Sequence, residues 1–322
     1  MKISVTAMLL LLLSSLGNAA SAALFMDDFN TANSANNYVV LTSSADNSVG
    51  FAFDYSSVGI PVAPNTTDAS TLGLRMASNL SLGAVAGVTL HTNQSFTGAY
   101  RVNFDAWINA NGPFPGGGGG STEYLTAGVG GNGTAVNLPG SGSGGWTAVS
   151  GEGGSTRDYR MYKDGAEQFA ESGQFAAGNS STSGGAHNNS DAYYAQFGSI
   201  DVGALPTQGG MASQTGTTAV GTFGFAWHEV ELLVDPAGTM TWSIDGLAIG
   251  TLDASVGTTF SIDGRVTIGY MDIFTSVSDN ATYSFGLVDN LSVTAVPEPS
   301  AGLACICLGV VATQVRRRRA KA

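Results

Sequence analysis

Hydrophobic residues along most of this chain recur with the two-residue period of β-strands. Between residues 23 and 295 the short alternating or β-rich runs are separated by clusters of turn-forming residues, and no segment favours a helix. This pattern is typical of an antiparallel sandwich or jelly roll. Strands are predicted near 24–29, 38–42, 49–55, 71–77, 85–91, 99–109, 122–129, 157–163, 193–197, 223–235, 238–244, 247–252, 265–274 and 283–294.

The clearest strand is Trp227–Val234, where apolar and polar side chains alternate. His228 and the three apolar residues in register with it share one face, which we expect to look into the sandwich. Glu229 and Glu231 lie on the opposite face, towards water or a groove. The next two runs, 239–244 and 247–250, flank Asp245-Gly246. Because both central residues of a type I′ turn need positive φ, this dipeptide predicts a β-hairpin.

Two segments break the strand pattern. The stretch 111–156 contains five consecutive glycines, Gly116 to Gly120, and further Gly and Ser clusters around Trp146. A segment of this kind loses much backbone entropy when it is ordered and has few side chains to bury. We therefore expect an insertion made of long loops around one strand, 122–129. A polar stretch at 178–190 is similar.

Composition excludes several classes of protein. Charged residues are 11% of the 322, glycine accounts for 45 and hydrophobic residues for 43%, which is enough for a core and excludes collagen, coiled coils and polytopic membrane proteins. The net charge is −12, and between residues 23 and 295 six basic residues stand against 23 acidic ones. Nucleic acid is therefore not an expected partner. Both cysteines, Cys305 and Cys307, lie outside that region, so it has no disulfide framework.

The two ends of the chain look like targeting segments. Residues 1–22 combine Lys2, a short apolar run and the small-residue site Ala20-Ser21-Ala22, which predicts a secretory signal peptide. Residues 296–322 contain an apolar run at 301–315 followed by a basic end at 316–321. Fifteen helical residues span about 22 Å, less than the ~30 Å of a hydrocarbon core, so this run predicts a marginal membrane anchor.

The C-terminal segment resembles the PEP-CTERM sorting tail of Gram-negative bacteria. Pro297-Glu298-Pro299, the apolar run and the arginine cluster occur in the family's order at the end of the chain. The resemblance covers about 27 residues. It implies processing by an exosortase, a transient inner-membrane anchor, and delivery to the cell surface or the exopolysaccharide matrix.

Residues 23–295 resemble a concanavalin A-like lectin/glucanase, or laminin-G-like, jelly roll. Asp27-Asp28-Phe29 is similar to the family's opening, Trp227-His228 with Trp242 to its central hairpin, and Val288–Val293 to its last strand. The resemblance implies one jelly-roll domain in which the first and last strands are neighbours. The glycine-rich middle departs from the compact family pattern.

The same resemblance implies a structural calcium ion. Acidic residues of the first and last strands often hold calcium in this family, and here they correspond to Asp28 and Asp289. Backbone carbonyls would complete a shell of about 6–8 oxygens. The alternative is that both are solvated acids or turn-forming residues.

The catalytic pattern of the family's glucanases is missing. Those enzymes carry Glu-x-Asp-x-x-Glu on one strand, and no such string occurs here. Glu229 and Glu231 lack a third acid, and the resemblance places them on the convex side, where the family has no catalysis. Glu123 is isolated, and the three histidines, His91, His187 and His228, are scattered. We therefore expect a protein that is not an enzyme.

Binding is the remaining expectation. Jelly rolls bind sugars by stacking aromatic rings on pyranose faces, with Asp and Asn hydrogen bonds around them. The candidate ligand-binding residues are Trp146, Tyr270 and Asp272. Trp146 is chosen because a lone Trp among Gly and Ser has little core to join; Tyr193-Tyr194 is comparable, whereas Trp107 fits a residue that caps a sheet face.

The sequence thus predicts a non-catalytic adhesion or carbohydrate-associating module of the envelope, with extracellular polysaccharide as its partner. A structural matrix protein without a specific ligand and a divergent glycoside hydrolase are the alternatives.

Overall fold

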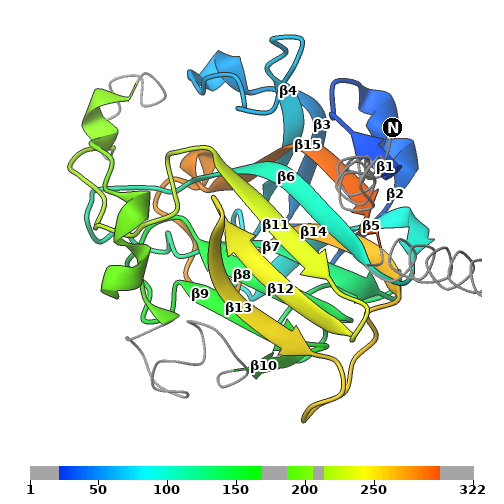
Figure 1. Cartoon of the computed structure of the whole chain (residues 1–322). Coiled ribbons are helices and arrows are strands. Elements are labelled where there is room, and N and C mark those ends of the chain that lie inside the picture. Colours follow the sequence, from blue (N-terminus) through cyan, green and yellow to red (C-terminus); the bar gives the residue numbers. More distant parts are fainter. Residues whose placement is uncertain (1–21, 169–186, 206–213, 298–322) are drawn as a thin grey trace, which may run out of the picture.

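The computed structural model describes residues 22–168, 187–205 and 214–297. These residues form two antiparallel β-sheets that face each other, which confirms the predicted all-β sandwich (Figure 1). Almost all of the signal segment 1–22, and all of 296–322 except Val296 and Pro297, lie outside the described residues. Glu298, Pro299 and the apolar run 301–315 are among the residues not described.

Sheet A carries eight strands. Its order is β13-β12-β11-β6-β15-β4-β3, and β1 pairs with the second half of β15. The strands are β1 (Ala23–Asp27), β3 (Ser48–Asp54), β4 (Leu72–Ala77), β6 (Tyr100–Asn109), β11 (His228–Val234), β12 (Thr239–Ile244), β13 (Leu247–Asp253) and β15 (Phe285–Ala295). The Asp245-Gly246 hairpin is confirmed, since β12 and β13 pair across it and both residues have positive φ.

Sheet B carries seven strands in the order β10-β9-β8-β7-β14-β5-β2. The strands are β2 (Tyr38–Thr42), β5 (Ala86–Phe96), β7 (Tyr124–Gly131), β8 (Gly145–Ser150), β9 (Tyr159–Lys163), β10 (Ala166–Gln168) and β14 (Gly264–Asp272). Neighbours in this sheet are often distant in sequence, which is the crossed connection expected of a jelly roll.

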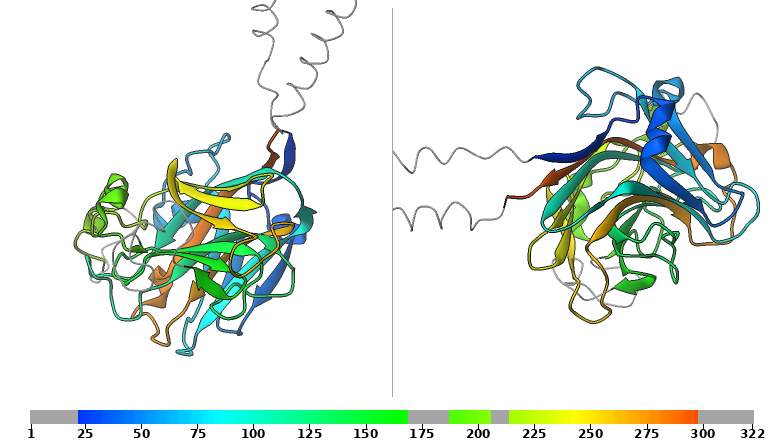
Figure 2. Two further views of the ribbon diagram at one scale, coloured as in Figure 1. Left: turned by 60° about the horizontal axis from the view of Figure 1, so that its bottom comes forward. Right: turned by 90° about the vertical axis from the view of Figure 1, so that its right-hand side faces the viewer.

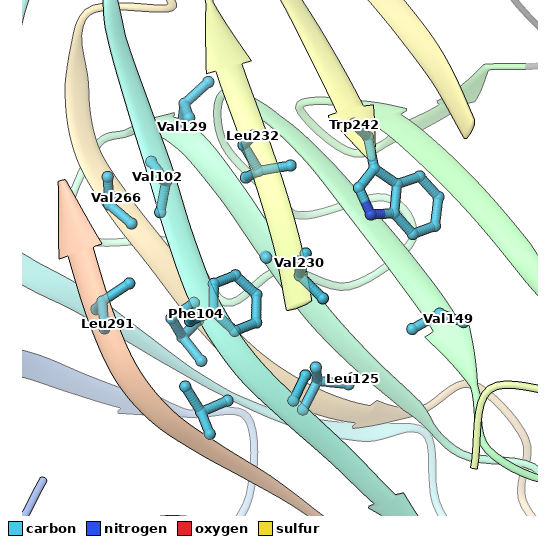
Figure 3. Close-up of a cluster of buried hydrophobic side chains, with 14 of the residues drawn as sticks. Val102, Phe104, Leu125, Val129, Val149, Val230, Leu232, Trp242, Val266 and Leu291 are labelled. Atoms are coloured by element: carbon cyan, nitrogen blue, oxygen red, sulfur yellow. The ribbon is translucent and has the colours of Figure 1, made fainter. Parts of the chain in front are cut away.

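The core lies between the two sheets. Alternate residues of most strands contribute to it, because successive side chains point to opposite faces. Figure 3 shows Phe104 of β6, Val230 of β11 and Trp242 of β12 meeting Leu125 of β7 and side chains from other strands of sheet B, all 3% exposed or less. Truncating one such side chain typically costs about 2–5 kcal/mol.

The first and last strands are neighbours, as the resemblance implied. β1 pairs antiparallel with β15, with Met26 opposite Ser292 and Asp27 opposite Leu291. Figure 2 shows the two strands side by side in both views. The pairing places the acidic turn that follows β1 next to the middle of β15.

The glycine-rich insertion 111–156 is more ordered than predicted. It contains two strands, β7 and β8, and not one strand among loops. The glycine run is fixed as well, because Gly119 N–H donates to Asp279 (3.1 Å) and Asp279 N–H donates back to the Gly119 carbonyl (3.0 Å). Because Gly119 has no side chain, its backbone can approach Asp279 closely. These hydrogen bonds order a segment that has few side chains to bury.

The strand predicted at 193–197 is wrong. Residues Ala192–Phe197 form the 3-10 helix η4. Its N-cap, Asp191, accepts a hydrogen bond from Tyr193 N–H (2.9 Å), and this local bond closes a turn where aromatic residues had suggested a strand. Tyr194 still packs inward and stacks on Tyr159 of β9 with ring centroids 4.0 Å apart.

Helices are short throughout the part of the chain that the structure describes. Within it, no helix is long and apolar enough to cross a membrane.

Candidate functional site

An open polar groove lies on the outer face of sheet A, where β1, β15, β6 and β11 run side by side. Its volume is about 650 Å³. Its lining residues are Met26, Asp27, Asp28, Asn65, Thr67, Arg101, Asn103, Phe104, Glu229, Glu231, Asn290, Leu291 and Ser292. Most of them carry hydrogen-bonding side chains, and Met26, which is 70% exposed, adds an apolar surface at the side of β1.

One wall of the groove is a ladder of paired polar side chains on β6 and β11. Arg101 Nε lies 2.9 Å from Glu231 Oε2, and Asn103 Nδ2 donates to Glu229 Oε1 at 3.1 Å. The two strands pair antiparallel with Glu231 opposite Asn103, so these are diagonal contacts. They confirm that the polar face of the 227–234 strand looks outward, and they place it in a groove.

The other wall is shaped by a bulge in β15. Asn290 has a φ of +53°, and the pairing of β15 with β6 shifts between Asp289 and Ser292. A bulge re-aims side chains, and here it directs the Asn290 amide across the sheet. The amide donates to Asp105 Oδ2 (2.8 Å) and to Thr66 Oγ1 (2.9 Å).

A loop that we call the strap, residues 59–71, crosses the outer face between the 3-10 helix η2 (Tyr55–Val58) and β4. It is held by Asp105, a fully buried residue of β6, which accepts hydrogen bonds from Asn65 N–H (3.0 Å) and Asn65 Nδ2 (2.7 Å). Near the N-terminal end of the strap, the Pro61 carbonyl accepts a hydrogen bond from Trp227 Nε1 at 2.7 Å. The strap thus closes one end of the groove.

Asp289, one of the predicted calcium ligands, lies buried beneath the strap at 2% exposure. It accepts hydrogen bonds from Tyr55 OH (3.0 Å) and Asn290 N–H (2.7 Å). Burial, and to a lesser extent the charges of Asp105 and Asp28, raises the pKa of Asp289 to about 7. The site therefore contains a carboxyl group that titrates near neutral pH.

The calcium prediction rests on two carboxylates. Asp28 is exposed in the turn after β1, and Asp289 is in the neighbouring strand. In residues 22–168, 187–205 and 214–297 no group of three or more acidic, His or Cys side chains is placed to hold a metal ion. Asp28 and Asp289 fit calcium only if backbone carbonyls and water supply the other oxygens, and the calcium site stays a prediction.

A second hollow, of about 330 Å³, lies beyond the strap. It is lined by Gly59, Pro61, Trp107, Leu205, Phe225, Ala226 and Trp227. Trp107 is 3% exposed and its ring meets Trp227 edge-on at 5.8 Å, so it caps the outer face of the sheet, as predicted. This hollow is aromatic where the groove is polar.

The loop position expected for Trp146 is wrong. Trp146 belongs to β8, is fully buried, and lies flat on Tyr162 with ring centroids 3.8 Å apart. Its Nε1 donates to the Asp164 carbonyl (2.5 Å). A ring already stacked on one face and covered on the other offers no surface to a sugar.

Tyr270 and Asp272 are also in the interior, and the groove does not include them. Both lie on β14 and are 1% exposed. Burial raises the pKa of Asp272 to about 6, although it accepts a hydrogen bond from Asn79 Nδ2 (2.6 Å). Glu123 is 2% exposed. Its burial, and to a lesser extent the charge of Asp272, raises the pKa of Glu123 well above its ordinary value. None of these groups contacts the outer surface where a polymer could bind.

The histidines are equally buried. His91 and His187 are fully buried, and His228 is 4% exposed with its Nδ1 2.6 Å from Asp245 Oδ2. Burial lowers the pKa of His91. None of the three histidines lines the groove, which offers amides, carboxylates and one guanidinium for hydrogen bonding.

Most of the groove residues were not predicted from the sequence. Arg101, Asn103, Asn65 and Asn290 were not candidates. The signal for two of them was present in the 99–109 strand, where Arg101, Asn103 and Asp105 alternate with apolar residues. Polar residues on one face of a strand are common, so this signal does not distinguish a groove from ordinary solvent exposure.

Fold and site together define a β-sandwich of the jelly-roll class with an open polar groove on one sheet. No protein-family model matches the chain. No curated protein matches it either.

Several solved structures are similar to this chain at low sequence identity. A Bacillus subtilis protein of unknown function with a galectin-like fold is 10% identical, with a TM-score of 0.43 over 85% of this chain and 96% of that one. The Emp47p carbohydrate recognition domain is 8% identical (TM-score 0.39; 87% and 100% covered). The Crh5 transglycosylase, solved with NAG, is 12% identical (TM-score 0.40; 87% and 86% covered). A carbohydrate recognition domain and an enzyme both occur among these structures.

Proposed function

We propose that this protein is an exported, non-catalytic carbohydrate-associating module whose groove on sheet A binds extracellular polysaccharide. The observation that carries the proposal is the open groove of about 650 Å³, lined by Asn103, Glu229 and Asn290. Its volume lies within the range of about 300–1,000 Å³ that is usual for ligand sites.

The groove's chemistry suits a polymer rich in hydroxyl groups. Carboxylate oxygens accept hydrogen bonds from hydroxyls, and amides both donate and accept them. The polar side chains are held in place by their neighbours, as in the Asn103–Glu229 and Asn290–Asp105 contacts. Groups fixed before binding lose less conformational entropy when a ligand arrives. The exposed Met26 supplies an apolar contact for a ring face.

The test is a comparison of two variants of the full chain on immobilised polysaccharides, including the exopolysaccharide of the source cells. Asn103→Ala removes an amide from the groove and is expected to weaken binding at least about tenfold, since it also leaves Glu229 without its donor. Thr241→Ala is the matched control. It removes a hydroxyl from β12 on the same outer face, outside the groove, where Thr241 meets Thr251 at 3.0 Å.

Thr241→Ala should leave binding unchanged. Binding that is lost equally in both variants would contradict a site in the groove. If no polysaccharide is bound at all, the alternative of a structural matrix protein without a specific ligand replaces the proposal.

Export and sorting complete the proposal. The signal segment 1–22 would direct the chain across the inner membrane, and the apolar run 301–315 would hold it there briefly. An exosortase acting near Pro297, Glu298 and Pro299 would then release the domain to the cell surface or matrix. The support for this step is the order of the motif, the apolar run and the basic end in the sequence.

Calcium between the terminal strands is part of the same proposal. If Asp28 and Asp289 hold the ion, chelation with EDTA is expected to lower the melting temperature of the purified protein, because bound metal stabilises the folded state by mass action. An unchanged melting curve in EDTA would remove calcium from the proposal and leave the groove untouched.

A further inference from the structure

The groove is strongly acidic. Four carboxylates line it, those of Asp27, Asp28, Glu229 and Glu231, against the single guanidinium of Arg101. Arg101 is already paired with Glu231 at 2.9 Å. Asp27 accepts from Ser34 OH (2.7 Å) and Asn37 Nδ2 (2.9 Å) and is 7% exposed. Asp28 and Glu229, both exposed, are the charges that a ligand meets.

The other basic residues of the domain do not line the groove, and each contacts groups elsewhere. Arg75 packs on Phe53 and Phe285, Arg157 and Arg160 pair with Glu167, Lys163 donates to the Val256 carbonyl, and Arg265 donates to the Thr92 carbonyl. With 23 acidic residues between positions 23 and 295, the field at the surface is negative. Such a field attracts cationic polymers and repels anionic ones.

Resting on the proposed glycan-binding function, we infer that the ligand is a polysaccharide that carries free amino groups, of the partly de-N-acetylated hexosamine class. An ammonium group would replace water at Glu229, the exposed acid that the calcium proposal does not use, while ring hydroxyls meet Asn103, Asn290 and Ser292. Hydrogen bonds to charged groups are about twice as strong as neutral ones. A uronic acid polymer would instead bring its carboxylates against those of the groove.

The test uses the full chain and three oligosaccharides of equal length: a glucosamine oligomer, its fully N-acetylated form and a uronic acid oligomer. The measurements are made at about pH 6, where the amino groups of the glucosamine oligomer carry positive charge. The glucosamine oligomer is expected to bind at least about tenfold more tightly than the acetylated one at low salt. That advantage should shrink in about 1 M salt, where the Debye length falls to about 3 Å. No binding of the uronic acid oligomer is expected.

Two variants separate charge from shape. Glu229→Gln keeps an acceptor for Asn103 Nδ2 but removes the charge, so it should weaken binding of the glucosamine oligomer about fivefold more than binding of the acetylated one. Asp279→Asn is the matched control: it neutralises an exposed acid on the β14–β15 loop and keeps an acceptor for Gly119 N–H. It should change neither affinity.

The outcomes distinguish this inference from the function on which it rests. Equal or tighter binding of the acetylated or uronic acid oligomer overturns the amine preference and leaves glycan binding standing. Equal binding of a lysine oligomer of the same charge overturns recognition of an amino sugar. Failure to bind any glycan overturns both proposals.

Discussion

The Gly130→Ala variant is expected to lose about 3 kcal/mol of unfolding free energy, which corresponds to a fall in melting temperature of roughly 6–12 °C. Gly130 lies in a bulge near the end of β7 with a φ of +71°. A Cβ added there would lie 1.7 Å from the Ser261 carbonyl oxygen, so backbone would have to move. The left-handed conformation costs about 1–2 kcal/mol for alanine, and overpacking typically adds about 1–3 kcal/mol.

Gly140→Ala is the matched control within the same insertion. Gly140 also has positive φ, +86°, but an added Cβ would meet no atom within 4 Å. The two variants share the conformational cost, and the difference between their melting temperatures measures packing alone. Equal melting temperatures would show that the backbone around Gly130 moves to accept the Cβ at no cost. That result would fit the long loops predicted for this insertion.

The strands of the sandwich could be predicted from sequence because alternation marks a face wherever one side is buried. Trp227–Val234 shows this most clearly, since its inward residues are buried and its glutamates are not. β8 was not predicted because all six residues of Gly145–Ser150 are buried and each face mixes apolar with small or polar residues, so no alternation appears. β8 forms because it pairs with β7 and β9, and its local hydrophobic pattern does not predict it.

The burial of Trp146 also depends on contacts between strands that are distant in sequence. Its partner Tyr162 is 16 residues away on β9, and the stacking exists because β8 and β9 pair with these two residues opposite each other. The sequence around Trp146, residues 138–150, contains no other aromatic residue and could not reveal the contact. An isolated aromatic residue in a glycine-rich segment is thus a poor indicator of a binding site in this fold.

The groove depends on strand order in space. Asn103 and Glu229 are 126 positions apart and meet because β6 pairs with β11, while Asn290 joins them because β15 pairs with the other edge of β6. Alternation predicts which side chains point outward, but it does not say which strands are neighbours. The individual polar faces could be predicted, and their assembly into one site could not.

The buried acids make stability depend on pH in an unusual direction. Burial raises the pKa values of Asp289 to about 7 and of Asp158 and Asp272 to about 6, against about 3.9 in an unfolded chain. The folded state therefore binds protons more tightly than the unfolded state between about pH 4 and 7. Stability from these groups increases as pH falls through that window and is lost as pH rises through the folded pKa. His91, whose pKa burial lowers, opposes them below its unfolded pKa of about 6.5.

The Asp289→Asn variant isolates the contribution of Asp289 to the pH dependence of stability, and a large effect is expected. Between about pH 8 and pH 5 the wild-type protein should gain about 2 kcal/mol more than the variant, or roughly 5 °C in melting temperature, because Asn mimics the protonated carboxyl at every pH. The variant keeps an acceptor for Asn290 N–H. Its Nδ2 can donate to Tyr55 OH, whose single proton can then be donated to the Ser70 carbonyl, 3.2 Å away, in place of position 289.

Melting curves of both proteins, recorded in EDTA so that any bound calcium does not contribute, check this expectation. The variant should also melt higher than the wild-type protein at about pH 8, where the wild-type protein keeps a charged Asp289 buried next to Asp105. Parallel pH profiles for the two proteins would contradict a carboxyl group at position 289 that titrates near neutrality. They would mean that Tyr55 OH and Asn290 N–H compensate its burial fully, which would lower its pKa to the ordinary range.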